Sequence, residues 1–221
     1  MTLVVAPCSH EAAKWAVEHW HYSRVLPTGK TNRYGIWEEG RFVGVVIYSR
    51  GSSPYLGRSL ELDMPTEICE LTRIAMTVHA VPVSAVIAQT LRSVKASNPR
   101  LRAVISFADP AEGHHGGIYQ AANWVYTGQS NEVREYRIGG RWRHTRGAYW
   151  HPARPTAPTR TAPGKHRYVF PLDRRMRKQV APLALPYPHA DEDSRGSRLG
   201  STEEGRVRSP ASAPTVSRVR A

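Results

Sequence analysis

The strongest constraint on the fold of this chain is a set of apolar runs that alternate with a helix-like segment. FVGVVIYS, residues 42–49, is almost continuously apolar and predicts a strand covered on both faces. CELTRIAM, residues 69–76, alternates as a second strand, and LRAVISFA, residues 101–108, is a third, apolar one. Residues 82–97 carry apolar side chains at helical spacing and stop before Pro99. Strands that alternate with helices predict a mixed α/β sheet.

Weaker signals predict the elements around this centre. Residues 10–20 follow Ser9, a good N-cap, and predict a helix. Residues 33–38 predict a strand that a tight hairpin joins to the apolar strand after it. The remaining expected elements follow the third strand: a short helix over 118–124, a strand over 124–128, a polar hairpin over 133–150 and a late strand over 166–172.

Composition and length suggest how the chain is organised. With 221 residues it can bury one good core. We expect a catalytic domain over residues 1–151, a Pro/Thr-rich linker over 152–165, and a C-terminal strand and extension over 166–185 that packs on the domain. Residues 186–221 are rich in Ser, Pro, Gly and Arg, which bury too little apolar surface to fold, so they predict a disordered basic tail.

The formal charge of +13 raises the question of a nucleic-acid partner. Residues 1–151 hold 17 Lys and Arg against 12 acidic residues, and residues 152–221 hold 14 against 6. A basic tail is equally compatible with a role in solubility alone. The hairpin gives a more specific signal, because its basic residues alternate with aromatic ones, a pattern that suits phosphate contact and base stacking unless the hairpin is a plain solvated edge. The candidate nucleic-acid-binding residues there are Arg141, Trp142, Arg143 and Arg146.

Several classes of protein receive no support. No apolar run approaches the length of a membrane span, and the first residues lack the basic start of a secretory signal. Cys8 and Cys69 make neither a disulfide framework nor a zinc motif. We therefore expect a protein of the reducing cytoplasm with no membrane partner.

The stretch SFADPAEGHHGGIYQAANW is the strongest candidate for a functional site. Asp109 follows an apolar strand directly, at the strand end where open α/β sheets bind ligands, although Asp-Pro is also an ordinary turn starter. His114 and His115 are adjacent, so we expect one imidazole to face the site and the other to face solvent. A weaker alternative places iron between two histidines and a carboxylate, with His21, Asp109, His114 and His115 as possible ligands.

Taken in order, these elements resemble the GNAT acyltransferases, whose sheet splays between the strands before and after the long helix and holds acyl-CoA in the gap. A narrower resemblance joins five blocks, which are HYSRVLPTG, GVVIYSRG, ELTRIAM, VSAVIAQTLR, and ISFADP with GHHGGIYQAANW. Together they resemble the Mom family of phage DNA-modification proteins. That resemblance implies a GNAT-like fold and an enzyme of the host-cell cytoplasm. The enzyme would convert adenine N6 in double-stranded DNA to N6-carbamoylmethyladenine and so protect the DNA from restriction.

The resemblance also implies roles for individual residues. It makes His21, Tyr22, Asp109 and Tyr119 catalytic candidates, whereas from the residues alone helix capping, a turn and core packing would explain them. It assigns Arg73 and Ser84 to the group donor, where the plainer readings are an ion pair with Glu67 or Glu70 and a helix cap.

The donor itself stays open at this point. An acyl-CoA-binding member has a glycine-rich diphosphate loop at the start of the long helix, but here that stretch is TVHAVPVSAV, without glycine. An acyl-CoA and an aminoacyl-type donor are both compatible with the sequence. Two other functions also remain open: an acetyltransferase of a protein or small amine, and a non-catalytic DNA-binding accessory protein.

Overall fold

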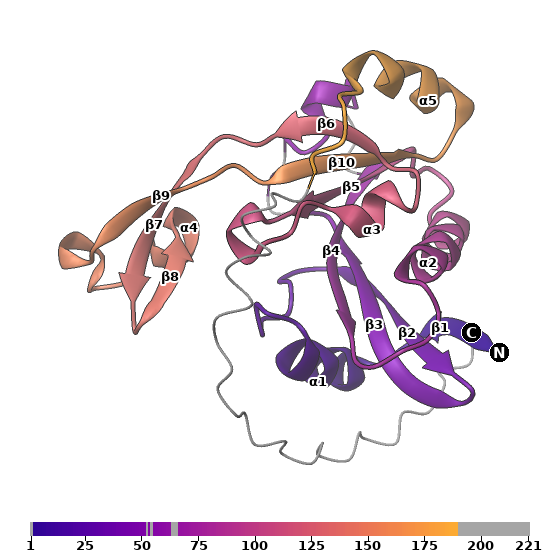
Figure 1. Ribbon diagram of the computed structural model, residues 1–221, viewed down its shortest axis with the longest axis horizontal. Coiled ribbons are helices and arrows are strands. Elements are labelled where there is room, and N and C mark those ends of the chain that lie inside the picture. The colour runs from indigo at the N-terminus through magenta and orange to yellow at the C-terminus, as the bar shows by residue number, and fades with distance from the viewer. Residues whose placement is uncertain (1, 52, 54, 63–65, 190–221) are drawn as a thin grey trace.

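A computed structural model describes residues 2–51, 53, 55–62 and 66–189, and a seven-stranded mixed sheet forms its body (Figure 1). In spatial order the strands are β1 (Leu3–Pro7), β2 (Thr31–Glu38), β3 (Arg41–Ser49), β4 (Ile68–Met76), β5 (Ala103–Ala108), β10 (His166–Pro171) and β6 (Val125–Gln129). Neighbouring strands are antiparallel except β4 and β5, which are parallel. The expected α/β class with a mixed central sheet flanked by helices is therefore confirmed.

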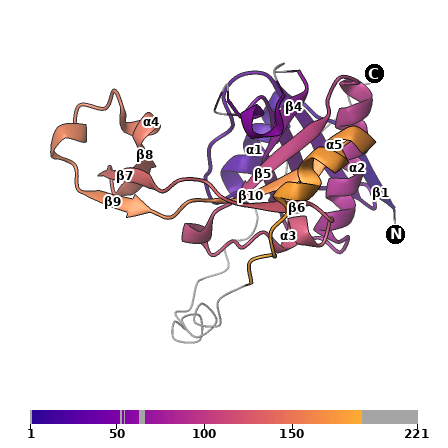
Figure 2. The ribbon, with the colours of Figure 1, turned by 90° about the horizontal axis from the view of Figure 1, so that it is seen from above.

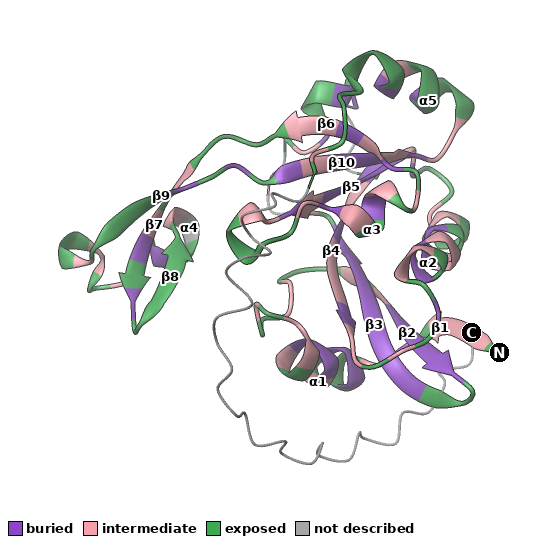
Figure 3. Ribbon diagram, viewed as in Figure 1, coloured by how far each residue is buried: buried purple, intermediate pink, exposed green. Residues whose placement is uncertain are grey.

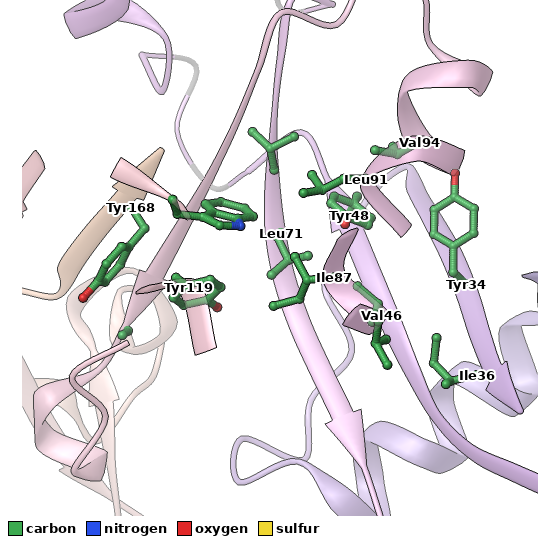
Figure 4. Close-up of a cluster of buried hydrophobic side chains, with 14 of the residues drawn as sticks. Tyr34, Ile36, Val46, Tyr48, Leu71, Ile87, Leu91, Val94, Tyr119 and Tyr168 are labelled. Carbon is green, nitrogen blue, oxygen red and sulfur yellow. The ribbon is translucent and has the colours of Figure 1, made fainter. Parts of the chain in front are cut away.

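Helices cover both faces of this sheet, as the alternation along β3 requires. On one face α1 (His10–Trp20) packs against Val45 and Ile47, and Ser9 caps the helix by accepting the N–H of Ala12. On the other face α2 (Val83–Ser97) packs against Val46 and Tyr48 in the main core, part of which Figure 4 shows. Because both faces are covered, β3 is buried almost throughout (Figure 3).

The sheet splays where β4 and β5 separate. Their parallel pairing is confined to Ile68–Glu70 on β4 and Ala103–Ile105 on β5. Beyond those residues β4 stays paired with β3 while β5 stays paired with β10. The C-terminal ends of the two strands therefore diverge, which is the splay that the GNAT resemblance implies.

A second, three-stranded sheet projects from the body as an arm, which we define as residues 130–165 (Figure 2). Its strands are β7 (Val133–Ile138), β8 (Arg141–His144) and β9 (Thr159–Ala162), and a short helix, α4 (Thr145–Ala148), packs on β7. The expectation that residues 152–165 form only a linker is wrong, because β9 lies within them. The Pro and Thr residues of this segment exclude a long helix, but they allow a four-residue edge strand, and β9 pairs with β7.

Two further elements had no sequence signal. The first strand, β1, pairs with β2 along the edge of the sheet, and α5 (Arg174–Val180) packs against β10. The late strand expected over 166–172 is β10, and it enters the sheet between β5 and β6.

The expected tail over 186–221 begins too early. Residues 186–189 still contact the body, because the Tyr187 hydroxyl donates to the Trp124 carbonyl and the Pro188 carbonyl accepts from Gln120. The rest of that segment, residues 190–221, lies outside the described residues. The expectation of a basic tail is also wrong. Residues 190–221 hold six Arg against five acidic residues, whereas residues 152–189 hold eight Lys and Arg against one.

None of the helices in the described part of the chain has the length and apolar character needed to cross a membrane.

Candidate functional site

A cavity of about 1100 Å³ lies beside the splay, between the body and the base of the arm. Its walls come from the end of α1, from β4, from the loop that follows β5, and from both chain segments that enter the arm. This volume is slightly above the usual range of about 300–1000 Å³ for small-molecule sites. The polar side chains discussed below that line it are His21, Tyr22, Arg73, Asp109, His114 and Lys165.

Asp109 stands at the strand end, as expected, and forms an ion pair with Lys165. The Lys165 Nζ lies 2.6 Å from Asp109 Oδ2, while Oδ1 accepts the N–H of Ala111 in the turn after β5. The interaction with Asp109 raises the pKa of Lys165 even though burial lowers it. Asp109 therefore does both things that the sequence suggested: it stabilises the turn after β5, and it presents a carboxylate to the cavity.

A close approach of two chain segments fixes Lys165. The Ser130 N–H donates to the Lys165 carbonyl, and the Lys165 N–H donates to the Ser130 hydroxyl, both at 2.9 Å. A Cβ on the preceding residue, Gly164, would lie within bonding distance of the Ser130 carbonyl oxygen. Only glycine fits there, so the entry and the exit of the arm are held together next to the ion pair.

His21 is held as a hydrogen-bond donor toward the cavity. Its Nδ1 accepts the N–H of Ser23 at 3.1 Å and lies 2.9 Å from the Ser23 hydroxyl. In the neutral ring the proton is then on Nε2. Burial, followed by the charges of Arg73, His114 and Lys165, lowers the pKa of His21 from 6.5 to about 4. The imidazole is therefore neutral at pH 7 and can donate its Nε2–H to a ligand.

An aromatic stack forms one wall of the cavity. The rings of His21 and Tyr22 stack with centroids 4.4 Å apart, and His114 meets Tyr22 edge-on at 5.5 Å. Tyr22 follows the end of α1 and is 50% exposed. A half-exposed ring of this kind offers a face on which a planar ligand can stack.

Arg73 projects from β4 into the same cavity. Its Nε donates to the Val25 carbonyl at 3.1 Å and one terminal nitrogen donates to the Thr72 carbonyl at 2.7 Å. These backbone contacts orient the guanidinium, and burial lowers the pKa of Arg73. Together with Lys165, which also lines the cavity, Arg73 provides positive charge suited to an anionic group on a ligand.

The loop after β5 curls tightly through glycines. Gly113 and Gly116 have φ values of +73° and +86°, which side chains rarely adopt. A Cβ on Gly116 would also overlap the ring of Tyr168, whose hydroxyl donates to the His115 carbonyl at 2.6 Å. As a result, the exposed His114 lies against Tyr22, while the half-buried His115 sits deeper in the loop.

Two of the expected site residues are placed differently from the others. Tyr119 reaches the cavity wall but is only 7% exposed, and its hydroxyl is 2.7 Å from that of Ser106. Burial raises the pKa of Tyr119 to about 12. Ser84 lies in the first turn of α2, and among the described residues that line the cavity none belongs to α2.

The suggested iron ligands do not converge. In the described part of the chain no group of three or more His, Cys, Asp and Glu side chains could hold a metal ion. Asp109 instead pairs with Lys165, and the Nδ1 atom of His21 is occupied by Ser23.

The arm presents basic and aromatic side chains to solvent. Arg141, Trp142 and Arg143 are exposed on β8, and Arg146 lies in α4. The Arg160 guanidinium lies over the Trp142 ring at 4.5 Å. Taken as a whole, the arm holds eight Lys and Arg against two acidic residues, so it carries a large share of the excess positive charge.

Sequence reasoning missed Lys165 and Ser23. Lys165 falls in the segment expected to be a linker, and its partner Asp109 is far away along the chain, so nothing local connects them. Ser23 follows His21 by two residues, and a Ser at that distance from a histidine was a usable signal for a fixed tautomer.

Comparison with known proteins shows which protein family this chain is similar to. The chain matches the model of the Mom protein family over residues 2–189. It is 26% identical over 193 residues to the methylcarbamoylase Mom of Escherichia phage Mu. This alignment covers 80% of this chain and 79% of that protein.

Solved acetyltransferase structures are also similar. The spermidine N-acetyltransferase of Vibrio cholerae is 10% identical, with 80% of this chain and 97% of that chain covered and a TM-score of 0.48. An aminoglycoside acetyltransferase in complex with coenzyme A and kanamycin is 10% identical, with 81% and 99% covered and a TM-score of 0.48.

Proposed function

We propose, from the premise that this chain belongs to the Mom protein family, that it is a transferase which modifies the exocyclic amine of adenine in double-stranded DNA. The modified base is N6-carbamoylmethyladenine. Its role is to protect phage DNA from restriction in the cytoplasm of the host cell. The Mom relative of phage Mu, named a methylcarbamoylase, supports this choice of group.

One observation carries the proposal furthest. The cavity is lined by the polar side chains of Asp109, Lys165 and His21, and it lies directly next to the base of the strongly basic arm. A volume of about 1100 Å³ is large enough for a purine together with the group that is transferred to it. An acetyltransferase of a small amine would need the cavity but would gain nothing from the basic arm.

The arm and the cavity suit different parts of one substrate. Arg141 and Arg143 would contact DNA phosphates, and Trp142, held under Arg160, would add a flat surface at the backbone. The adenine amine is inaccessible within a base stack, so the base must leave the duplex to react. Tyr22 would then stack on the extruded adenine inside the cavity.

The chemistry assigns separate roles to the polar residues. The N6 lone pair is delocalised into the ring, so adenine attacks only if a base removes its proton. As the bond from N6 to the transferred carbon forms, the bond between that carbon and the rest of the donor breaks, and the leaving group departs with that electron pair. Asp109 would act as the base, because Lys165 holds its carboxylate in place at the cavity, while the ring nitrogen of His21 that is not bonded to Ser23 already carries a proton. His21 would donate its Nε2–H to an acceptor atom of the base or of the donor, and Arg73 would bind an anionic group of the donor.

Tyr119 has a supporting role in this scheme. Its hydroxyl is engaged by Ser106 and its pKa is raised to about 12, so at pH 7 it stays protonated and holds the wall behind the loop. Ser84 lies away from the cavity and has no part in it.

Restriction protection tests the proposal in cells. Plasmid DNA from cells that express the protein is expected to resist restriction enzymes whose sites contain adenine, and DNA from cells that express Asp109→Ala is expected to be cut. Equal cutting of both DNAs, with both proteins well expressed, would contradict the proposal and favour the acetyltransferase of a protein or small amine. Equal protection by both would instead favour a DNA-binding protein that acts without catalysis.

A further inference from the structure

The GNAT resemblance implies an acyl-CoA, whose diphosphate would lie at the start of the long helix, which is α2. In that arrangement the backbone N–H groups of the loop before α2 hold the diphosphate. Here the loop comprises residues 77–82, and it packs against the end of the β2–β3 hairpin.

A carboxylate of the chain itself already occupies two N–H groups of this loop, those of Ala80 and Val81. Glu38 is only 5% exposed, and its Oε1 accepts the N–H of Val81 at 2.9 Å while its Oε2 accepts the N–H of Ala80 at 3.0 Å. These N–H groups lower the pKa of Glu38, so the group is an anion at neutral pH. A bound diphosphate would have to displace it or lie beside a like charge.

Neighbouring contacts fix the same loop. Arg41 donates to the Val78 carbonyl at 3.2 Å, and the Thr77 N–H donates to the Val43 carbonyl at 3.0 Å. Both partners belong to the hairpin that carries Glu38. Several hydrogen bonds therefore fix the loop to the β2–β3 hairpin. The bonds to Glu38 belong to this buried contact, so Glu38 is not a loose surface side chain.

The splay is closed as well. Just beyond the last parallel pair, the Ser106 hydroxyl lies 2.7 Å from the Leu71 carbonyl and 2.7 Å from the Tyr119 hydroxyl. Leu71 and Ser106 are almost fully buried, at 2% and 1% exposed. The strand carbonyl at the mouth of the gap is thus already bonded within the protein, and side chains of the main core pack beside it (Figure 4).

The cavity reaches Leu71 and Tyr119 from the face of the sheet on which α1 packs. It includes the end of α1, with Trp20, His21 and Tyr22, and among the described residues that line it none comes from loop 77–82 or from α2. We propose that Glu38 fills the place of the cofactor diphosphate, so that the group donor is not a CoA thioester. The donor is instead a compound without a diphosphate arm, which enters the α1-side cavity beside the base and faces Arg73 and Lys165. This inference rests on the proposed function only in naming the ligand a group donor.

Binding of coenzyme A to the full-length protein is the direct test. Calorimetric titration with coenzyme A, and separately with acetyl-CoA, is expected to give no saturable heat, and millimolar coenzyme A is expected to leave the Tm unchanged. Saturable binding at micromolar concentration, or a Tm that rises with coenzyme A concentration, would overturn the inference.

Matched variants test the role of the carboxylate. Glu38→Ala is expected to lower the Tm, since it removes the acceptor of the buried Val81 N–H and of the Ala80 N–H, whereas Ala at the exposed neighbour Glu39 is expected to lower it less. Equal Tm values for the two variants would overturn the assigned role of Glu38. If Glu38→Ala does not fold, the titration of the unaltered protein still decides.

Parallel analysis of plasmid DNA separates this inference from the proposed function. Modified adenine without coenzyme A binding supports both. Modified adenine with coenzyme A binding overturns the donor inference alone. Unmodified adenine without coenzyme A binding overturns the proposed function alone.

Discussion

At the scale of single residues, the site depends on which groups hold which protons. Asp109 and His21 were both catalytic candidates in the sequence, but their neighbours in the structure separate their roles. Lys165 keeps Asp109 in an ion pair, and Ser23 fixes the tautomer of His21. Residue types alone cannot reveal this difference, because it depends on hydrogen bonds to residues outside any recognisable motif.

The ion pair gives the first prediction. Lys165→Met removes the cation beside Asp109, and loss of a charge-assisted hydrogen bond of about 1.5–3 kcal/mol corresponds to roughly a ten- to hundredfold fall in modification rate. Lys165→Arg is expected to retain part of the activity. Nucleoside analysis of plasmid DNA measures the modified fraction, with Lys14→Met on exposed α1 as the control. Unchanged modification by Lys165→Met would show that the pair is not needed.

The buried His21 gives a prediction on stability and pH. Its pKa is about 4 in the folded protein against 6.5 in the unfolded chain, so between these pH values the unfolded state binds the additional proton. The free energy of unfolding should therefore fall as the pH drops from 7 to 5. His21→Gln removes this contribution while keeping an acceptor for Ser23, so its stability should fall less steeply over the same range.

Urea unfolding at pH 7 and pH 5 measures this difference. The exposed His19→Gln on the same helix is the control, and it should follow the unaltered protein. Parallel pH dependence of His21→Gln and the unaltered protein would show that the imidazole is not held neutral.

At the scale of elements, local patterns predicted what is local. The α1 cap, the β2–β3 hairpin, α2 and the β7–β8 hairpin all follow from short-range signals, the last from Gly139 and Gly140 with positive φ. Strand β9 did not, because its pairing with β7 is long-range and its own composition resembles a linker. The insertion of β10 between β5 and β6 is also long-range, and it is what brings Lys165 to Asp109.

The arm gives a prediction about DNA affinity. Arg143→Ala should weaken DNA binding about equally for all sequences and reduce the slope of log affinity against log salt by about 1, as expected for one lost phosphate contact. Fluorescence anisotropy with duplex DNA at several salt concentrations measures both quantities. Arg174→Ala on α5 serves as the control, and an equal effect of both variants would mean that general charge, and not the arm, binds DNA.

At the scale of the whole molecule, the described residues contain every part that the account uses. The family match ends at residue 189, the cavity and arm lie within it, and residues 190–221 carry nearly balanced charge. A chain truncated after His189 should therefore modify DNA at a rate within about threefold of the full chain, a difference of under 1 kcal/mol. Loss of modification in a folded, truncated chain would give those last residues a role in the reaction.

The central claim is that a group is transferred to adenine in this cavity, and mass spectrometry of nucleosides from plasmid DNA tests it most directly. Cells expressing the unaltered protein should yield a deoxyadenosine heavier by a carbamoylmethyl group, and cells expressing Asp109→Ala at the same level should not. Plain deoxyadenosine in both samples, with full-length protein present, would contradict the claim. The same heavy nucleoside in both would keep the activity but remove it from this site.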